Sequence, residues 1–327
     1  MQAGRRLTGI LALCALAALS GACVSIELPG GVPPPLVETT VFGSAGPKIL
    51  MLQIDGVLSE ESESSWLGLR RESVVARVRE ELDRARDDQA IAALLVRIDT
   101  PGGTVTASDL IYQEILRFKR ERGVPVVAQL MGMATSGGYY VAMSADAVIA
   151  HPTTVTGSIG VIFTGLNLSG LMDKLGVADQ TITSGKFKDA GSPLRPMRPE
   201  ERAQIQSVID DMYQRFLSVV REGRPSLAPE QVAKLADGRI YSAQQALANG
   251  LVDQVGGIEE TVGVARARAG LAEARVVTYH RPREYRKNLF TAALAQGAPE
   301  ADVWPGPKLR LPEPAFLYLW APGAMLE

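Results

Sequence analysis

Short, almost continuously apolar runs alternate along this chain with longer segments that repeat apolar residues at helical spacing. The runs at 48–54, 91–98 and 125–131 have the length of strands that are buried on both faces. The segments between them, 71–88 and 105–121, carry the amphipathic pattern of helices. Because strands joined through helices run parallel, the sequence predicts an α/β fold with largely parallel β-sheets covered by helices.

Further helices are predicted towards the C-terminal end. The stretch 198–222 is the longest, and Ile205, Ile209 and Phe216 fall on one side of it. The other predicted helices lie near 167–175, 229–236, 242–248 and 258–269.

Composition excludes several classes of function. The chain has 327 residues with a formal net charge of −2, so it offers no basic field for a nucleic-acid backbone. Its two cysteines, Cys14 and Cys23, both lie near the N-terminus. The folded region therefore has neither a disulfide framework nor a Cys/His metal cluster.

The N-terminus has the pattern of a targeting segment. Arg5 and Arg6 precede an apolar run from Leu7 to Leu19, and small residues then lead to Cys23. Residues 1–23 thus predict a signal peptide with a lipobox-like end and lipidation at Cys23. Leu19 stands four positions before that cysteine, where a lipobox has its leucine three before, so plain secretion and an uncleaved anchor remain alternatives. A membrane-anchored protein of the bacterial envelope, with its globular domain outside the cytoplasm, is expected.

Composition changes mark the domain boundaries. Residues 24–46 are rich in proline and glycine and predict a tether, and residues 47–280 form the predicted globular domain. The tail, 281–327, is basic and then proline-rich, with an apolar patch at 316–320. Two interpretations of the tail stay open, disorder or a strap onto a neighbouring subunit.

Ser136 lies in the run MGMATSGGYYVAM, where a predicted strand turns into a helix. A serine on a tight turn at a helix N-terminus has an exposed hydroxyl and free backbone N–H groups nearby, which suits an acyl-transfer nucleophile. The same residues also suit an ordinary turn into a buried helix. The motif alone does not decide between the two.

Three glycine-rich turns follow predicted strands, at 99–103, 134–140 and 154–161. Parallel sheets place such turns at one edge, so they are expected to converge. Backbone N–H groups at Gly102 and Gly103, together with that of Gly137, would then form an oxyanion hole. Each turn taken alone is equally consistent with a structural role.

The base that would activate Ser136 is less obvious. His151 and His280 are the only histidines, and neither has an acidic neighbour typical of a catalytic triad. A neutral lysine is the alternative, and Lys186 and Lys188 lie in the turn-like segment SGKFKDAGSP. A lysine acts as a base near neutral pH only when burial lowers its pKa by about two to three units. A solvated turn is the competing interpretation.

The motifs MATSGGYYVA, DTPGG, TGSIGV and FKDAGSP, in this order and spacing, resemble the bacterial signal peptide peptidase A family of membrane-bound serine proteases. The likeness covers about residues 48–270. It implies that Ser136 is the nucleophile and Lys188 the general base. Ser158, in TGSIG, corresponds to a serine that orients the base lysine. Gly102, Gly103 and Gly137 correspond to the oxyanion hole, and Lys186 and His151 have no catalytic counterpart.

The resemblance also implies a crotonase/Clp-protease-like fold that assembles into an oligomeric ring or dome, with no metal or organic cofactor. The chain has one serine motif and one lysine motif, so it resembles the half-length, single-domain members, in which the serine and lysine of one site can come from adjacent protomers. The implied substrates are remnant signal peptides and other short hydrophobic segments in or near the membrane.

Two other functions remain as alternatives. A crotonase-type acyl-CoA enzyme would share the fold and the oxyanion hole but would need paired acids, and the motifs place none beside the glycine turns. A non-enzymatic envelope scaffold would keep the fold and bind a partner through residues 316–320.

Overall fold

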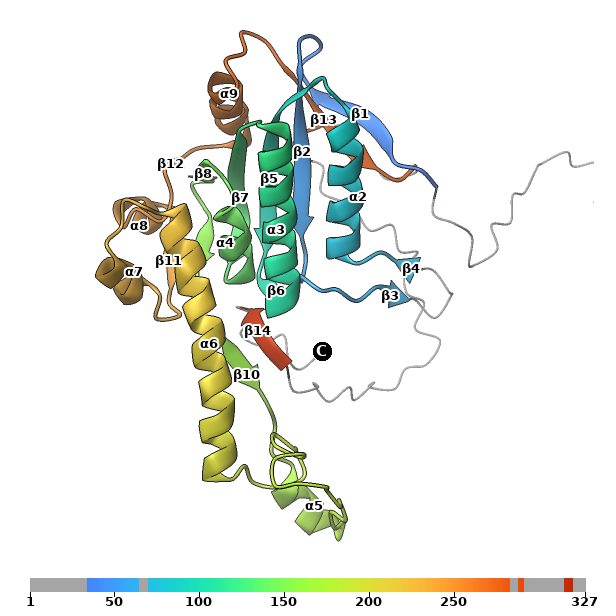
Figure 1. The fold of residues 1–327 in the computed structure, drawn as a ribbon, viewed down its shortest axis with the longest axis vertical. Coiled ribbons are helices and arrows are strands. Elements are labelled where there is room, and N and C mark those ends of the chain that lie inside the picture. The colour runs from blue at the N-terminus through green and yellow to red at the C-terminus, as the bar shows by residue number, and fades with distance from the viewer. Residues whose placement is uncertain (1–33, 65–69, 283–287, 291–314, 320–327) are drawn as a thin grey trace, which may run out of the picture. The chain divides into compact units, whose positions relative to one another are not determined.

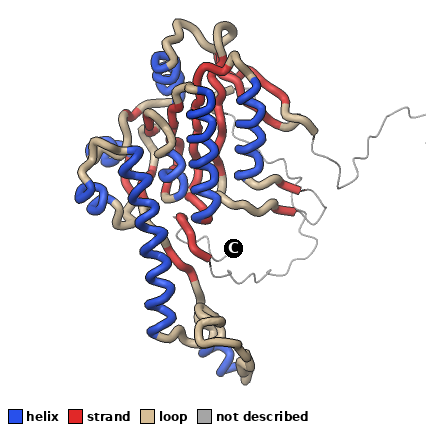
Figure 2. The backbone as a smooth tube through the Cα atoms, viewed as in Figure 1, coloured by secondary structure: helices blue, strands red, loops and turns tan. Residues whose placement is uncertain are grey.

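The computed structural model describes residues 34–64, 70–282, 288–290 and 315–319 (Figures 1 and 2). The chain divides into two units, residues 1–33 with 64–70, and residues 34–63 with 71–327. The main sheet and all the described helices belong to the second unit. Within the described part of the chain, no helix has the length and apolar character needed to cross a bilayer. The predicted signal peptide and Cys23 lie outside the described residues.

A nine-stranded, mostly parallel sheet forms the centre of the second unit. Neighbouring strands along its main path are parallel except at the β1 edge, and the branch strand β9 runs parallel to β7 while β11 is antiparallel to β9. The main path is β1 (Val37–Phe42), β13 (Arg275–His280), β2 (Lys48–Asp55), β5 (Ile91–Thr100), β7 (Val126–Thr135), β8 (Ala147–Ala150) and β12 (Gln254–Val255). The branch comprises β9 (Val155–Gly157) and β11 (Ile240–Ser242).

Side chains that alternate along the strands cover both faces of this sheet. Leu50 of β2 packs into the cluster that also holds the apolar residues of α2 (Val74–Asp87) and α3 (Val105–Arg122). Its neighbour Ile49 belongs to a second cluster with α9 (Ile258–Arg268). Figure 1 shows α2 and α3 side by side over one face of the strands. Both faces are buried, which explains why the strands read as apolar runs without alternation and confirms the predicted α/β class.

The remaining described helices also follow the predicted segments, and every helix predicted from periodicity lies within three residues of its expected bounds. They are α4 (Gly137–Ala142), α5 (Ser169–Leu175), α6 (Pro199–Gly223), α7 (Pro229–Leu235) and α8 (Ala243–Ala248). Two very short strands, β3 (Glu63–Ser64) and β4 (Arg70–Arg71), and two further strands, β6 (Gly102–Thr104) and β10 (Ile162–Thr164), complete the described elements apart from one strand in the tail.

The ends of the folded region differ from the expectation. Residues 37–42, inside the predicted tether 24–46, form β1 and pair antiparallel with β13, so regular structure begins before residue 47. In the tail, Ala315–Leu319 forms β14, which pairs with β6 and β10 of the same chain. Neither interpretation of the tail described this arrangement, because pairing across such a separation leaves no local periodicity in the sequence.

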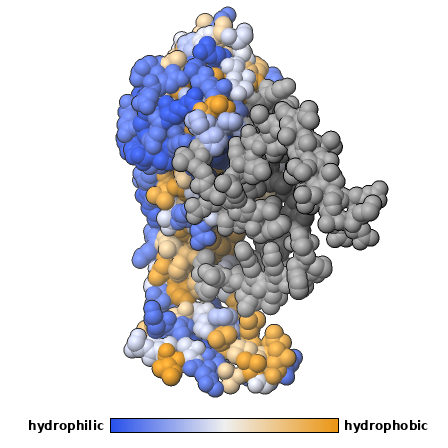
Figure 3. Space-filling view, turned by 90° about the vertical axis from the view of Figure 1, so that its right-hand side faces the viewer, coloured by the Kyte–Doolittle hydropathy of each residue, from blue (hydrophilic) through white to orange (hydrophobic). Residues whose placement is uncertain are grey.

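Residues 165–198, between β10 and α6, form a segment that we name the arm. It holds α5, and nearly all of its residues from 165 to 188 are exposed. Its exposed apolar side chains are Leu166, Leu171, Leu175, Val177, Ile182 and Phe187. The apolar surface at the bottom of Figure 3 belongs to this arm.

Candidate active site

Parallel pairing of β7 with β9 brings Ser136 and Ser158 together. Thr135 is the last paired residue of β7 and lies opposite Gly157, so each serine is the next residue after a matched pair. The N–H of Ser136 donates to the Gly157 carbonyl at 2.7 Å. This pairing also explains why β7 continues four residues past its predicted end at residue 131.

Both serines adopt a backbone conformation that is unusual for residues with a side chain. Ser136 has φ 53° and Ser158 has φ 50°, and no other described non-glycine residue has a positive φ. Such a conformation costs about 1–3 kcal/mol and persists only where the surroundings impose it. Here the Tyr140 N–H donates to the Ser136 carbonyl at 2.9 Å, and the Ser158 N–H donates to the Arg239 carbonyl at 2.8 Å. The strain is therefore confined to the two serines that the sequence motifs single out.

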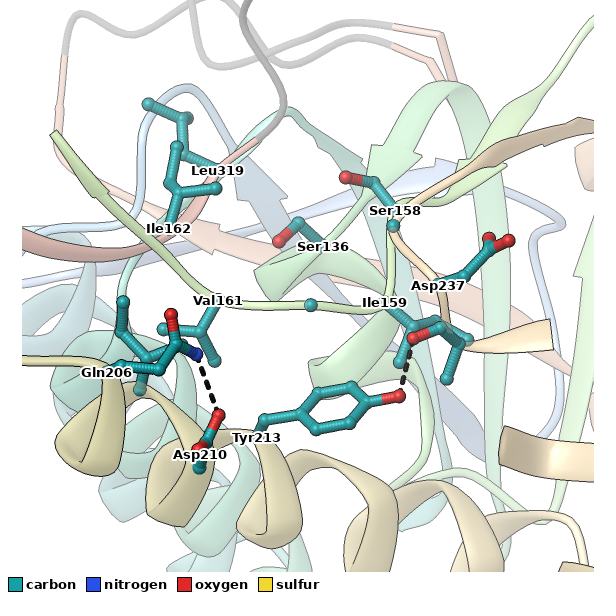
Figure 4. Close-up of a pocket in the computed structure, with 14 residues that line it drawn as sticks. Ser136, Ser158, Ile159, Val161, Ile162, Gln206, Asp210, Tyr213, Asp237 and Leu319 are labelled. Atoms are coloured by element: carbon teal, nitrogen blue, oxygen red, sulfur yellow. Dashed lines mark hydrogen bonds between the residues drawn. The ribbon is translucent and has the colours of Figure 1, made fainter. Parts of the chain in front are cut away.

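The two serines line one pocket of about 580 Å³, shown in Figure 4. Ser136 is only 1% exposed and Ser158 8%, and the Ser136 side chain makes no capping hydrogen bond to α4. Apolar side chains and glycines make up most of the wall. It comprises Ser136, Ser158, Ile159, Gly160, Val161, Ile162, Gln206, Ile209, Asp210, Tyr213, Ala236, Asp237, Gly238 and Leu319.

Gly102 of β6 and Gly137 of α4 lie against each other beside this pocket. Gly102 has φ 103°, and a Cβ built on it would lie 2.9 Å from the Gly137 nitrogen and 1.9 Å from the Tyr318 carbonyl oxygen. A Cβ built on Gly137 would lie 3.2 Å from the same oxygen. Only glycine fits at the first position, because a side chain would occupy the space that a carbonyl oxygen now fills.

Gly103 is constrained on its other side by Leu58. The Leu58 N–H donates to the Gly102 carbonyl at 2.8 Å, and the Thr104 N–H donates to the Leu58 carbonyl at 2.9 Å. Since successive residues of a strand direct their hydrogen-bonding groups to opposite edges, those of Gly103 face the edge that β14 occupies. The three glycines predicted for an oxyanion hole are thus brought together next to Ser136.

Lys188 lies elsewhere in the same chain. It is exposed, in the turn of the arm, and its N–H donates to the Gly185 carbonyl at 3.1 Å. Lys186 is also exposed and forms an ion pair with Glu200 at 3.5 Å. Among the described residues, neither a lysine nor a histidine lines the Ser136 pocket. Within one chain, therefore, Lys188 does not line the pocket that holds Ser136.

The histidines have partners outside this pocket. His151 Nδ1 is 2.9 Å from Thr153 Oγ1, and His280 Nε2 is 2.9 Å from Thr39 Oγ1. Neither side chain reaches the pocket that holds Ser136, in keeping with the lack of triad neighbours in the sequence.

A buried carboxylate anchors the turn that carries Lys188. Glu201, at the start of α6, is fully buried and accepts two hydrogen bonds from Arg195, at 2.6 and 2.9 Å. Arg195 Nε also donates to Asp189 Oδ2 at 2.7 Å, so the residue next to Lys188 is tied to the helix end. These hydrogen bonds from Arg195 hold the pKa of Glu201 at about 2.

The model of peptidase family S49 matches residues 118–272, a span that includes Ser136, Ser158 and Lys188. A protein of Enterococcus faecium that bears the name signal peptide peptidase SppA is 38% identical over 242 residues, which are 74% of this chain and 70% of that protein. The chain belongs to peptidase family S49. This confirms the resemblance drawn from the motifs, and the protein is accordingly a serine peptidase.

Two further similarities were found. A Synechocystis protein named as a protease is 44% identical over 190 residues, 58% of this chain and 68% of that protein. Among solved structures, a ClpP1 mutant from Listeria monocytogenes matches 65% of this chain and 94% of its own, with a TM-score of 0.42 and 16% identity.

The sequence alone did not reveal two parts of the pocket wall. Gln206, Ile209 and Tyr213 come from α6, and Leu319 comes from β14. The amphipathic pattern of α6 marks Ile209 as inward-facing, yet it does not say that a serine faces it. For Leu319, the sequence showed only that it belongs to the apolar patch 316–320, and this patch did not indicate a position in the pocket wall.

Proposed function

We propose that this S49 peptidase is a membrane-tethered endopeptidase that uses Ser136 as nucleophile and Lys188 of an adjacent protomer as general base. The observation that carries the proposal is the pair of strained serines in one pocket whose described lining holds neither a lysine nor a histidine. Lys188 stands exposed on the arm of the same chain, where it is free to reach a neighbour.

The proposed reaction is acyl transfer. The Ser136 Oγ attacks the peptide carbonyl carbon while neutral Lys188 accepts the hydroxyl proton, and Ser158 orients the amine. Backbone N–H groups at Gly103 and Gly137, with Gly102 shaping the turn, stabilise the oxyanion. Lys188 then protonates the leaving amine as the C–N bond breaks, and water hydrolyses the acyl-enzyme.

When the arm of a second copy enters the pocket, Lys188 on that arm would also become buried among apolar atoms. Burial among apolar atoms lowers the pKa of an amine, and both the pocket wall and the arm offer such atoms. A homo-oligomer, ring or dome, satisfies this requirement and covers the exposed apolar side chains of the arm.

Complementation between two inactive variants tests the shared site. Ser136→Ala and Lys188→Ala are each expected to abolish peptide cleavage. When the two are co-expressed with different tags and purified together, about one quarter of wild-type activity should return, because one in four mixed neighbours pairs an intact serine with an intact lysine. Lys186→Ala serves as the matched control and should keep full activity. A co-purified mixture with no activity would place both residues of a site in one chain or reject the dyad.

The proposed substrates are remnant signal peptides or other short hydrophobic segments at the outer side of a bacterial membrane. Lipidation at Cys23 would hold the enzyme there. Intact mass of the N-terminus tests the anchor, since Cys23→Ala should remove the lipid mass and move the protein to the soluble fraction. The acyl-CoA alternative loses its support because the family is one of peptidases.

A further inference from the structure

Two buried threonines lie behind the turn that carries the proposed oxyanion glycines. Thr100 is the last residue of β5 and Thr135 the last of β7, and neither is exposed to solvent. Neither is among the described residues that line the Ser136 pocket, so neither is placed to touch a bound peptide. Both direct their hydroxyl groups to the backbone of the turn instead.

The peptide bond between Pro101 and Gly102 is held at both of its polar groups. The Gly102 N–H donates to Thr100 Oγ1 at 3.0 Å, and Thr135 Oγ1 donates to the Pro101 carbonyl at 3.1 Å. The bond is trans, so its N–H and its carbonyl point in opposite directions. We name these two hydroxyls the threonine clamp. Rotation of the peptide would break both of its hydrogen bonds.

The clamp is continuous with the contact that orients the next peptide. Thr100 Oγ1 donates to the Gly56 carbonyl, and the Leu58 N–H donates to the Gly102 carbonyl at 2.8 Å. The Gly103 N–H belongs to the same peptide as the Gly102 carbonyl and points the opposite way. The hydrogen bonds on either side of Gly102 therefore set the direction of a proposed oxyanion donor.

The methyl group of Thr100 lies against the helix that follows the nucleophile. A Cβ built on Gly138 would lie 2.7 Å from Thr100 Cγ2 and 3.3 Å from the Thr100 carbonyl oxygen. Gly138 is the second residue of α4 and stands two positions after Ser136. One threonine thus holds the glycine turn with its hydroxyl and limits the position of α4 with its methyl.

Gly102 does not select its own conformation. It has φ 103°, and glycine adopts positive and negative φ about equally well. Turns of types I and II differ by rotation of their central peptide, which changes the sign of φ at the residue that follows it. The Pro101–Gly102 peptide could rotate in this way without a steric penalty at Gly102. The selection must therefore come from groups outside the glycine, and the clamp provides them.

We propose that Thr100 and Thr135 are positioning residues for catalysis, whose hydroxyls keep the Pro101–Gly102 peptide in the orientation that directs the Gly103 N–H towards the oxyanion. This role rests on the proposed function, in which Ser136 attacks the carbonyl whose oxygen becomes that oxyanion. A chain with the peptide rotated still binds substrate but stabilises the transition state poorly. Loss of a hydroxyl therefore lowers kcat and leaves KM almost unchanged.

Substitutions that change one group at a time test the clamp. Thr100→Val keeps the shape and the methyl but loses the hydroxyl, and it should lower kcat about 10- to 100-fold with KM changed less than about twofold. Thr100→Ser restores the hydroxyl and should keep kcat within about threefold of the wild type. Thr135→Val and Thr135→Ser should differ in the same way. The double valine variant should be little worse than the more damaged single one, because both hydroxyls hold the same peptide.

Thr261→Val is the matched control. Thr261 is fully buried in α9, and its hydroxyl donates to the Gly257 carbonyl at 3.0 Å, away from the glycine turn. This variant also loses a buried hydroxyl, so its Tm should fall about as much as that of Thr100→Val while its kcat stays unchanged. Equal losses of kcat in Thr261→Val and Thr100→Val, or full kcat in Thr100→Val, would overturn the proposal.

Amide hydrogen exchange of residues 99–104 provides a readout that needs no catalysis. The Gly102 N–H should exchange about tenfold faster in Thr100→Val than in the wild type, because it has lost its acceptor, and Thr100→Ser should keep the protection. Unchanged exchange in Thr100→Val would overturn the clamp. Cleavage that survives Ser136→Ala would overturn the proposed function, whereas faster exchange at Gly102 would still establish the clamp.

Discussion

At the scale of single residues, backbone strain and close approach set the site apart. Ser136 and Ser158 have positive φ values at the two points where β7 and β9 end their pairing. Gly102 has its Cβ position filled by a carbonyl oxygen. These conformations lower stability, and they persist because hydrogen bonds from neighbouring turns hold them in place.

The strain at Ser136 predicts that its removal stabilises the protein. Glycine adopts positive φ without steric cost, so Ser136→Gly should raise the free energy of unfolding by about 1 kcal/mol relative to Ser136→Ala. Urea denaturation measures the difference. Equal stabilities of the two variants would mean that the serine carries no backbone strain.

Two substitutions at Ser158 separate the backbone strain of this residue from the function of its hydroxyl. Both Ser158→Gly and Ser158→Ala lack the hydroxyl, but only the glycine variant relieves the positive φ. If the hydroxyl orients the base, both should lower kcat by a similar factor, about 10- to 100-fold, with little change in KM. Steady-state kinetics decides, and an active Ser158→Gly variant would assign the residue a purely structural role.

We expect the Gly102→Ala substitution to reduce catalysis. The new Cβ would meet the Tyr318 carbonyl oxygen and the Gly137 nitrogen, so it should lower kcat/KM by about 100-fold or more, the usual cost of a damaged oxyanion hole. Gly132→Ala is the control, because the Cβ built there has only an ordinary contact, 3.6 Å from Asp99 Oδ1. Unchanged activity of Gly102→Ala would argue against the oxyanion role.

At the scale of elements, the arm and α6 act together through Glu201. The ion pairs of Glu201 and Asp189 with Arg195 fasten the Lys188 turn to the first turn of the helix. The exposed apolar residues of the arm contribute nothing to this fastening within one chain. The position of Lys188 therefore depends on a few polar contacts.

Glu201→Gln is expected to loosen the turn. Amide hydrogen exchange of residues 185–198 should speed up about tenfold, because the neutral side chain loses the charge that Arg195 pairs with. Glu200→Gln is the matched control, since Glu200 is 56% exposed and its ion pair with Lys186 is long. Equal exchange in both variants would show that Glu201 does not hold the turn.

The lowered pKa of Glu201 also predicts a pH dependence. A carboxyl group whose folded pKa is below its unfolded value stabilises the fold above the unfolded value and loses this effect as pH falls through the folded one. With a folded pKa of about 2, protection of residues 185–198 should persist at pH 4 and fade as the pH approaches 2. Loss of protection already near pH 4.5 would contradict this assignment.

At the scale of the whole molecule, the proposed base Lys188 does not line the Ser136 pocket of its own chain. Ser136 and its glycines are assembled within the second unit, while Lys188 stands on an exposed arm whose apolar side chains have no cover. Ile182 is the most exposed of them, at 96%. An assembly of several copies would bury these side chains and complete the sites.

Charge placed on the arm should therefore disrupt both assembly and activity. Ile182→Asp is expected to shift the protein to smaller species in light scattering and to lower kcat/KM in proportion, because a buried charge opposes association. Leu110→Asp, at an exposed apolar position on α3, is the control and should leave both unchanged. An Ile182→Asp variant that stays assembled and active would remove the arm from the interface.

The sequence by itself determined the elements and the family. Apolar runs and helical spacing located the strands and helices, because burial on both faces of a parallel sheet and on one face of a helix leaves a local pattern. The spacing of Ser136, Ser158 and Lys188 within glycine-rich motifs pointed to the peptidase family that the comparison confirmed.

Only the tertiary structure decided what lies side by side. The β7–β9 register set Ser136 next to Ser158, and the pairing of Ala315–Leu319 with β6 and β10 put the tail beside Gly102 and Gly103. Such contacts join residues that are far apart in the chain, and each depends on backbone hydrogen bonds that every residue type can make. For this reason the apolar patch 316–320 was the one signal of the tail strand in the sequence, and it did not indicate which strands or aromatic rings the tail would contact.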